Sequence, residues 1–119
     1  MSICLLKSKI HRACVTGASL HYEGSLTIAS DLAERVGLLP YERILVSNMA
    51  QGQRFETYVI YGAAGSGVIE LNGAAAHLGQ IGDRVTIMSF SWLEAKEAAQ
   101  HKPKVIVVDE KNTPIRESY

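Results

Sequence analysis

Short stretches of strand-type sequence, broken by turn residues every few positions, constrain the fold of this chain more than any other feature. The sequence predicts extended segments at residues 2–11, 44–48, 54–61, 68–71, 84–90 and 104–108, and a further strand within residues 20–28. Turns rich in glycine, asparagine or aspartate separate several of them. Because many short strands with small helices are typical of small β-barrels, the chain is predicted to be mainly β and to form such a barrel.

Two short helices are expected between these strands. Residues 31–36 form the first, with Ser30 as its N-cap and Gly37 closing it. The second is indicated by the capping box Ser91-Trp92-Leu93-Glu94, which predicts a helix that continues to about Gln100. The predicted class is therefore mainly β with short helices.

Composition limits the number of domains and the kinds of partner. The chain has 119 residues, which is enough for one domain spanning residues 1–119. It is 47% hydrophobic and 20% charged with zero formal net charge, which gives no support for a nucleic acid or an anionic membrane as partner and favours self-association. It contains neither an apolar run that would span a bilayer nor a signal-peptide pattern, so a cytoplasmic location is expected, with Cys4 and Cys14 as free thiols.

The dipeptide Gly24-Ser25 offers a chemical possibility, because a chain can cut itself at such a bond. Glycine allows a strained peptide geometry in which the serine hydroxyl reaches the preceding carbonyl. The hydroxyl could take the acyl group from its own nitrogen to give an ester, and β-elimination followed by hydrolysis would leave a pyruvoyl group. The products would be residues 1–24 and residues 25–119. Taken alone, such a pair is more often an ordinary turn.

Further motifs follow one another in a fixed order from residue 9 to about residue 90. They are Lys9-Ile10-His11-Arg12-Ala13, Val15-Thr16, Leu20 to Ser25, Asn48, Gly52, Arg54-Phe55, Thr57-Tyr58, Asn72-Gly73-Ala74-Ala75-Ala76-His77 and Gly82-Asp83. In these motifs the chain resembles the aspartate 1-decarboxylase family, small pyruvoyl enzymes that make β-alanine for pantothenate synthesis. The resemblance implies a double-psi β-barrel assembled as a homotetramer, a pyruvoyl group derived from Ser25, and L-aspartate as substrate. Some relatives need a maturation factor, and the sequence leaves open whether this chain does.

The predicted strand at residues 54–61 carries three candidate site residues. Strand side chains alternate, so Arg54 and Tyr58 point to one face and Thr57 to the other. A guanidinium at Arg54 could hold a substrate carboxylate with two hydrogen bonds. The resemblance implies that Tyr58 is the proton donor and that Thr57 binds substrate and steadies the cleavage oxyanion. For Thr57 this requires either a bulge that re-aims it or a site in which neighbouring subunits use both faces.

The segment that begins at Asn72 is a second candidate for substrate binding. A helical turn is predicted at residues 74–78, and the backbone N–H groups at its start attract anions. The resemblance implies that the backbone of Gly73, Ala74 and Ala75 binds substrate and that Asn72 lies beside the scissile bond. Without the resemblance, this segment is an asparagine-glycine turn leading into an alanine turn.

The resemblance also implies supporting roles for Lys9, His11 and Tyr22. Lys9 and His11 share one face of the first predicted strand by alternation. The resemblance implies that they lie near the active site, with Lys9 as a carboxylate partner and His11 as an aid to cleavage. Tyr22 precedes the proposed cut and would help to position it. Each of these residues could equally be a polar residue of a barrel.

A metal site, a binding module and a decarboxylase of another amino acid are the alternative functions for these residues. The ligand-type residues Cys4, His11, Cys14 and His21 match no compact zinc spacing, so no metal site is predicted. One rival is a non-catalytic double-psi barrel that acts as a binding module, in which Ser25 would stay intact. The other is a pyruvoyl decarboxylase of another amino acid such as glutamate, which the reach from the reacting carbon to Arg54 would distinguish.

Overall fold

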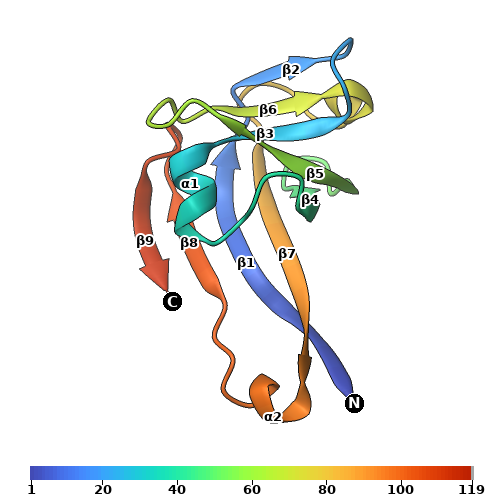
Figure 1. Cartoon of the computed structure of the whole chain (residues 1–119). Helices are drawn as coiled ribbons and strands as arrows, with labels where there is room; N and C mark the ends of the chain where they lie inside the picture. The colour runs from blue at the N-terminus through green and yellow to red at the C-terminus, as the bar shows by residue number, and fades with distance from the viewer. Residues whose placement is uncertain (119) are drawn as a thin grey trace.

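The computed structural model describes residues 1–118, which form nine strands and three short helical segments (Figure 1). The strands are β1 (Ser2–Cys14), β2 (Gly17–Ser19), β3 (Ser25–Ala29), β4 (Arg43–Asn48), β5 (Arg54–Gly62), β6 (Ile69–Asn72), β7 (Arg84–Glu94), β8 (Lys104–Val108) and β9 (Pro114–Ser118). The helical segments are α1 (Ser30–Arg35), the 3₁₀ helix η1 (Gly73–Leu78) and α2 (Ala95–Ala98). None of the helices in residues 1–118 has the length and apolar character to cross a membrane.

The strands form one mixed sheet in the order β2-β6-β3-β5-β4-β7-β1-β8-β9. β3 pairs parallel with β5 on one side and antiparallel with β6 on the other, while β1 lies between antiparallel β7 and parallel β8. The prediction of a mainly β fold with short helices is thereby confirmed. Closure of this sheet into a double-psi barrel stays a prediction, because β2 and β9 end the strand order within residues 1–118.

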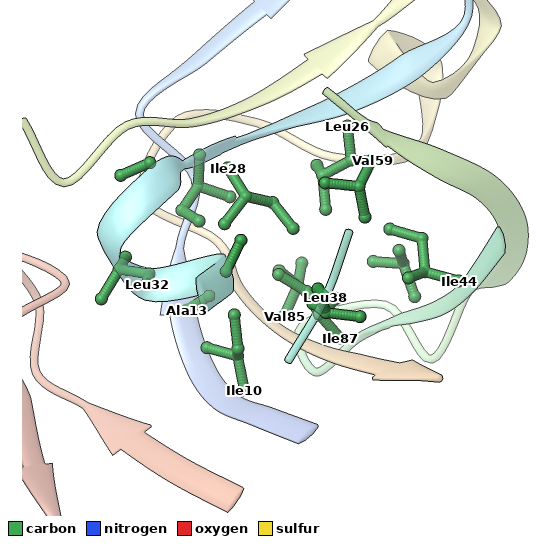
Figure 2. Packing of buried hydrophobic residues seen from close by; sticks show 14 of the residues in the cluster. Ile10, Ala13, Leu26, Ile28, Leu32, Leu38, Ile44, Val59, Val85 and Ile87 are labelled. Atoms are coloured by element: carbon green, nitrogen blue, oxygen red, sulfur yellow. The ribbon is translucent and has the colours of Figure 1, made fainter. Parts of the chain in front are cut away.

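The hydrophobic core lies where β3, β5 and β6 face β1, β4 and β7. Aliphatic side chains from these strands and from the loop after α1 are fully buried there, among them Ile10, Leu26, Ile28, Leu38, Ile44, Val59 and Ile87 (Figure 2). Burying such a side chain contributes about 1.5–3 kcal/mol to folding. Because Leu26 and Ile28 anchor β3 in this core, the residue that begins β3 is held on a rigid element.

The first half of β1 and the end of β7 leave the core together as a long two-stranded arm (Figure 1). Their pairing continues to Ser2 opposite Glu94, and α2 follows at the tip. The arm carries exposed apolar side chains, with Trp92 72% exposed. A groove of about 380 Å³ runs between the arm and β4, lined by Cys4, Arg43, Ile44, Leu45, Glu56, Phe90 and Trp92.

The arm corrects the prediction for the second helix. Residues 91–94 belong to β7, and the helix that follows is only the four-residue α2, whose N-cap position is occupied by Glu94 without a side-chain hydrogen bond. Pairing with β1 provides hydrogen-bond partners for backbone groups of these residues, so a tertiary contact outweighs the local capping pattern. Ser30 is likewise not an N-cap: it begins α1, and Ala29 occupies the cap position without a side-chain hydrogen bond.

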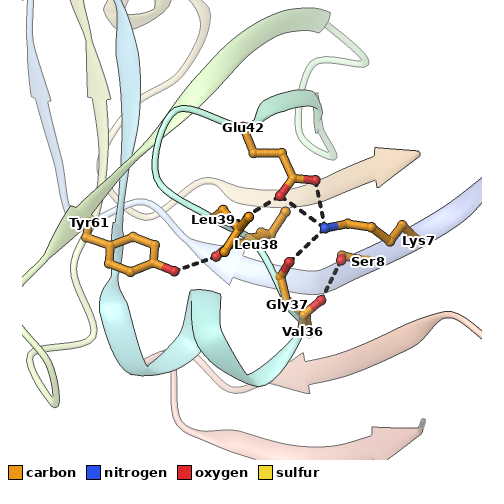
Figure 3. Close-up of polar contacts among 8 residues, drawn as sticks. All are labelled: Lys7, Ser8, Val36, Gly37, Leu38, Leu39, Glu42 and Tyr61. Carbon is orange, nitrogen blue, oxygen red and sulfur yellow. Dashed lines mark hydrogen bonds and ion pairs between the residues drawn. The ribbon is translucent and has the colours of Figure 1, made fainter. Parts of the chain in front are cut away.

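The segment between α1 and β4 is fixed by a polar network (Figure 3). The Lys7 ammonium donates to the Gly37 carbonyl at 2.7 Å and lies 2.8 Å from the Glu42 carboxylate. That carboxylate also accepts the backbone N–H of Leu39 at 3.0 Å, and the Tyr61 hydroxyl donates to the Leu38 carbonyl at 2.6 Å. The loop that leads into β4 is therefore tied to both β1 and β5.

Candidate active site

Ser25 is the first residue of β3 and is completely buried, at 0% exposure. It lies opposite Asn72 in the antiparallel pairing of β3 with β6. The Asn72 amide donates one hydrogen bond to Ser25 Oγ at 2.9 Å and another to Thr27 Oγ1 at 2.8 Å. Ser25 Oγ in turn donates to the carbonyl of Glu23 at 3.3 Å. The hydroxyl is therefore held in place by a donor and an acceptor, away from bulk water.

The chain before Ser25 passes directly over Gly73. Gly73 has a φ of +67°, and a Cβ at this position would lie 2.7 Å from Gly24 Cα and 3.0 Å from the Tyr22 carbonyl oxygen. Only glycine fits such a close approach and such a φ without strain. Gly24, by contrast, has no positive φ, and a Cβ there would meet nothing within 4 Å. The steric requirement for glycine thus lies at Gly73, and no backbone strain of this kind exists at Gly24 in the uncut chain.

A pocket of about 410 Å³ opens beside this crossing. It is lined by Gly24, Phe55, Glu56, Thr57, Tyr58, Asn72, Ala74, Ala75 and Leu78. The small side chains of Ala74 and Ala75 leave space at the start of η1, and the residue on the amino side of Ser25 forms part of the wall. The structure thus brings Gly24 of the candidate cut together with the candidate acid Tyr58 and with Ala74 and Ala75 of the candidate substrate-binding turn, whereas Gly73 is not among the lining residues.

Both Thr57 and Tyr58 line this pocket, although they are neighbours on one strand. β5 pairs with β4 at residues 54–58, but its pairing with β3 begins only at Val59. The other edge of β5 is therefore free of strand pairing at Thr57 and Tyr58, and the pocket lies at this edge. Side chains from both faces of the strand can border a pocket at its edge, so neither a bulge nor a second subunit is needed to place Thr57 beside Tyr58.

Lys9 and His11 line a different pocket, of about 350 Å³, together with residues of β8 and β9. Burial lowers the pKa of the His11 imidazole, and nearby cations, led by Lys9, lower it further. The His11 ring therefore favours its neutral form at neutral pH. Within one chain, neither residue reaches the pocket that contains Tyr58.

Arg54 and Tyr22 also lie outside the lining of the Tyr58 pocket. Arg54 is exposed at the start of β5, and the Tyr22 side chain is exposed in the turn before the candidate cut. Tyr22 contributes its backbone carbonyl to the crossing over Gly73. The part of the chain that the structure describes contains no cluster of three metal-ligating side chains.

Sequence reasoning missed two contacts around the site. Thr27 shares the Asn72 amide with Ser25, and its position two residues further along the same strand was a usable signal. The Tyr41 ring lies against the Tyr58 ring, with centroids 6.4 Å apart. Tyr41 precedes β4 in a loop, so no periodicity in the sequence pointed to this contact.

The chain is thus a small, mainly β protein with a buried serine hydroxyl beside a pocket that a tyrosine lines. Comparison with known proteins defines the family: residues 1–115 match the family model described as aspartate decarboxylase. The aspartate 1-decarboxylase of Chloroherpeton thalassium is 52% identical over 114 residues, covering 96% of this chain and 84% of the relative. That of Leptospira biflexa is 53% identical over 115 residues, covering 96% of this chain and 98% of the relative. The chain belongs to the aspartate decarboxylase family.

Proposed function

We propose that this chain is an aspartate 1-decarboxylase that converts L-aspartate to β-alanine and carbon dioxide for pantothenate synthesis. The observation that carries the proposal is the buried Ser25 hydroxyl, held by Asn72 beside a pocket that Gly24 and Tyr58 line. Relatives with this printed activity match nearly the whole chain at about half identity, which supports the same reaction here.

The proposed cofactor is a pyruvoyl group made from Ser25. The surrounding residues fit such a group, because position 25 is buried, Asn72 donates to its side-chain oxygen, and Gly24 lies in the pocket wall. A pyruvoyl group supplies a carbonyl that accepts the substrate amine and draws electrons away from the bond to the departing carboxylate.

The proposed maturation uses the chain's own groups. Ser25 Oγ attacks the Gly24 carbonyl carbon and loses its proton, the bond from that carbon to the Ser25 nitrogen breaks, and the nitrogen gains a proton. Loss of the proton on Ser25 Cα then expels the Gly24 carboxylate and would leave dehydroalanine at position 25, and addition of one water would release ammonia and leave the pyruvoyl carbonyl. The Asn72 amide keeps the hydroxyl in one orientation before attack, an arrangement that lowers the entropy cost of the step. Adding a cell extract to the purified chain tests whether a maturation factor assists this step.

The pocket offers distinct groups for binding and for proton transfer. The backbone of Gly73, Ala74 and Ala75 would bind substrate at the turn where the alanine side chains leave room. Thr57 would add a hydroxyl, and Tyr58 would hold a proton at its phenol oxygen for delivery to the α-carbon after carbon dioxide leaves. Tyr22 would support the turn that carries the cut.

The proposed assembly is a cytoplasmic homotetramer. Lys9 and His11 line a separate pocket within one chain, so their proposed supporting roles require that a neighbouring protomer bring them to the Tyr58 pocket. The exposed apolar side chains of the arm, including Phe90 and Trp92, are the kind of surface that an assembly covers.

The direct test is incubation of the purified protein with L-aspartate, followed by amino-acid analysis and intact mass measurement. We expect β-alanine together with two polypeptides divided between Gly24 and Ser25. Equal turnover of L-glutamate would favour the decarboxylase of another amino acid. Binding without turnover by a chain that stays intact, even with a cell extract added as a source of a maturation factor, would favour the binding module.

If Arg54 binds the substrate carboxylate in the assembled protein, although it lies outside the Tyr58 pocket of a single chain, Arg54→Ala should weaken aspartate turnover by about ten- to a hundredfold, because a charge-assisted hydrogen bond to a carboxylate is worth roughly 1.5–3 kcal/mol. Cleavage of the chain should change little. Arg54→Lys keeps the charge but loses the bidentate hydrogen-bonding geometry, so its turnover should lie between that of the wild type and that of Arg54→Ala. The measurement is kcat/KM on fully cleaved protein. Unchanged kinetics in Arg54→Ala would remove Arg54 from the site, a result its exposed position makes worth testing.

A further inference from the structure

Tyr41 adopts a backbone conformation that a bulky residue normally avoids. Its φ is +71°, in the left-handed region, and its side chain is 78% exposed. Such a conformation costs free energy in a residue with a Cβ and persists only where surrounding contacts hold it. An exposed tyrosine gains too little from burial to compensate, so the conformation calls for another explanation.

Backbone hydrogen bonds hold Tyr41 next to the candidate acid. The Tyr41 N–H donates to the Val59 carbonyl at 2.7 Å, and the Val59 N–H donates to the Glu42 carbonyl at 3.0 Å. Val59 directly follows Tyr58 in β5. The Glu42 side chain is itself fixed by Lys7 and by the Leu39 N–H (Figure 3). The loop at Tyr41 is therefore attached to β5 beside Tyr58 and to β1 through Lys7.

In this position the Tyr41 ring contacts the Tyr58 ring. The centroids are 6.4 Å apart and the ring planes meet at 34°, within the range of favourable aromatic pairs. Tyr58 lines the 410 Å³ pocket, whereas Tyr41 does not. Tyr41 therefore acts on the pocket indirectly, through its contact with the Tyr58 ring and through the backbone of β5 that it bonds.

We propose that Tyr41 is a positioning residue for Tyr58, restricting that ring so that its phenol oxygen stays directed at the substrate carbon. The inference rests on the proposed function, since it assigns Tyr58 the role of acid. Restricting a proton donor raises the fraction of molecules in a reactive geometry. The strained φ of Tyr41 is then the cost of presenting an aromatic ring at this point of the loop.

Tyr41→Gly separates this role from a structural one. Glycine accepts a positive φ without strain, and this relief offsets the lost ring contact and the added freedom of the unfolded chain, so the melting temperature should change little. Loss of the ring should nevertheless lower kcat about three- to tenfold, the worth of an aromatic pair, with little change in KM. Tyr41→Phe keeps the ring and should keep kcat. A fall in kcat that tracks a fall in melting temperature would overturn the inference, as would an unchanged kcat in cleaved Tyr41→Gly.

A second measurement does not depend on catalysis. In the uncut Ser25→Ala chain, the ring proton signals of Tyr58 should shift in the NMR spectrum when Tyr41 becomes glycine. Leu39→Ala, which truncates another exposed side chain of the same loop, should leave them in place. If the chemical shifts of the Tyr58 ring protons do not change in Tyr41→Gly, the two rings are not in contact and the inference is wrong. Full turnover by Tyr58→Phe would refute the proposed acid, whereas full turnover by Tyr41→Gly beside an impaired Tyr58→Phe would refute only the role of Tyr41.

Discussion

Ser25→Ala should give a single polypeptide of residues 1–119 that produces no β-alanine. The substitution removes the hydroxyl that would attack the Gly24 carbonyl, and with it the only source of the proposed carbonyl group. The fold should survive, because alanine suits a fully buried position in β3. The loss leaves one Asn72 N–H without its acceptor, which costs roughly 1–3 kcal/mol of stability. Intact mass spectrometry and an aspartate assay measure the two outcomes.

Ser89→Ala is the matched control for this prediction. Ser89 is also a buried strand serine, but its hydroxyl has no hydrogen-bond partner within residues 1–118. Its loss should leave both cleavage and turnover intact. If Ser25→Ala protein still decarboxylates aspartate, the reaction does not depend on a group made from Ser25, and the proposed chemistry is wrong.

Tyr58→Phe should still be cut into two chains. Its rate of turnover should fall by a factor of roughly 10²–10⁴, which is the usual contribution of a positioned general acid. Phenylalanine preserves the ring and its contact with Tyr41, and it removes only the hydroxyl that would deliver the proton. Substrate should still bind covalently through its amine, so borohydride treatment should trap it on the larger chain. The measurements are the single-turnover rate and the trapped mass.

Tyr61→Phe serves as the control, since Tyr61 lies three residues further along β5 and bonds the Leu38 carbonyl outside the pocket. Tyr61→Phe should lower the free energy of unfolding but leave the rate of decarboxylation unchanged. Near-normal β-alanine production by cleaved Tyr58→Phe would show that another group or water supplies the proton. A Tyr58→Phe chain that stays uncut would show that Tyr58 also serves the cleavage step.

The fold could be predicted from sequence where local patterns and tertiary pairing agree. The strands at 44–48, 54–61 and 104–108 are confirmed within a residue or so, because turns bound each of them. β2 and β9 were missed, since the short β2 and the exposed β9 are made by pairing with β6 and β8 rather than by an apolar pattern. The strand expected within residues 20–28 is β3, which begins at Ser25, and residues 20–24 before it form a turn and bends.

The site was predictable in its chemistry more than in its geometry. The motifs named Ser25, Asn72 and Tyr58, and the structure places Asn72 against Ser25 and in the pocket with Tyr58. Alternation predicts Thr57 and Tyr58 on opposite faces of β5 and did not reveal that both line one pocket, because the pocket lies where β5 is not yet paired with β3. It could not show that Lys9 and His11 line another pocket, since that depends on the path of β8 and β9.

The inner position of β1 in the sheet, between β7 and β8, has a consequence for recovery from unfolding. A cut after Gly24 would leave β1 without a covalent link to the larger chain, yet still hydrogen-bonded to β7 on one side and β8 on the other. The severed peptide would thus be retained as an inner strand, and folding must come before cutting. Once denatured, the mature protein would have to bring two polypeptides back together. Its renaturation should therefore depend on concentration more steeply than that of the uncut chain, and a heated, dilute sample should fail to regain its structure.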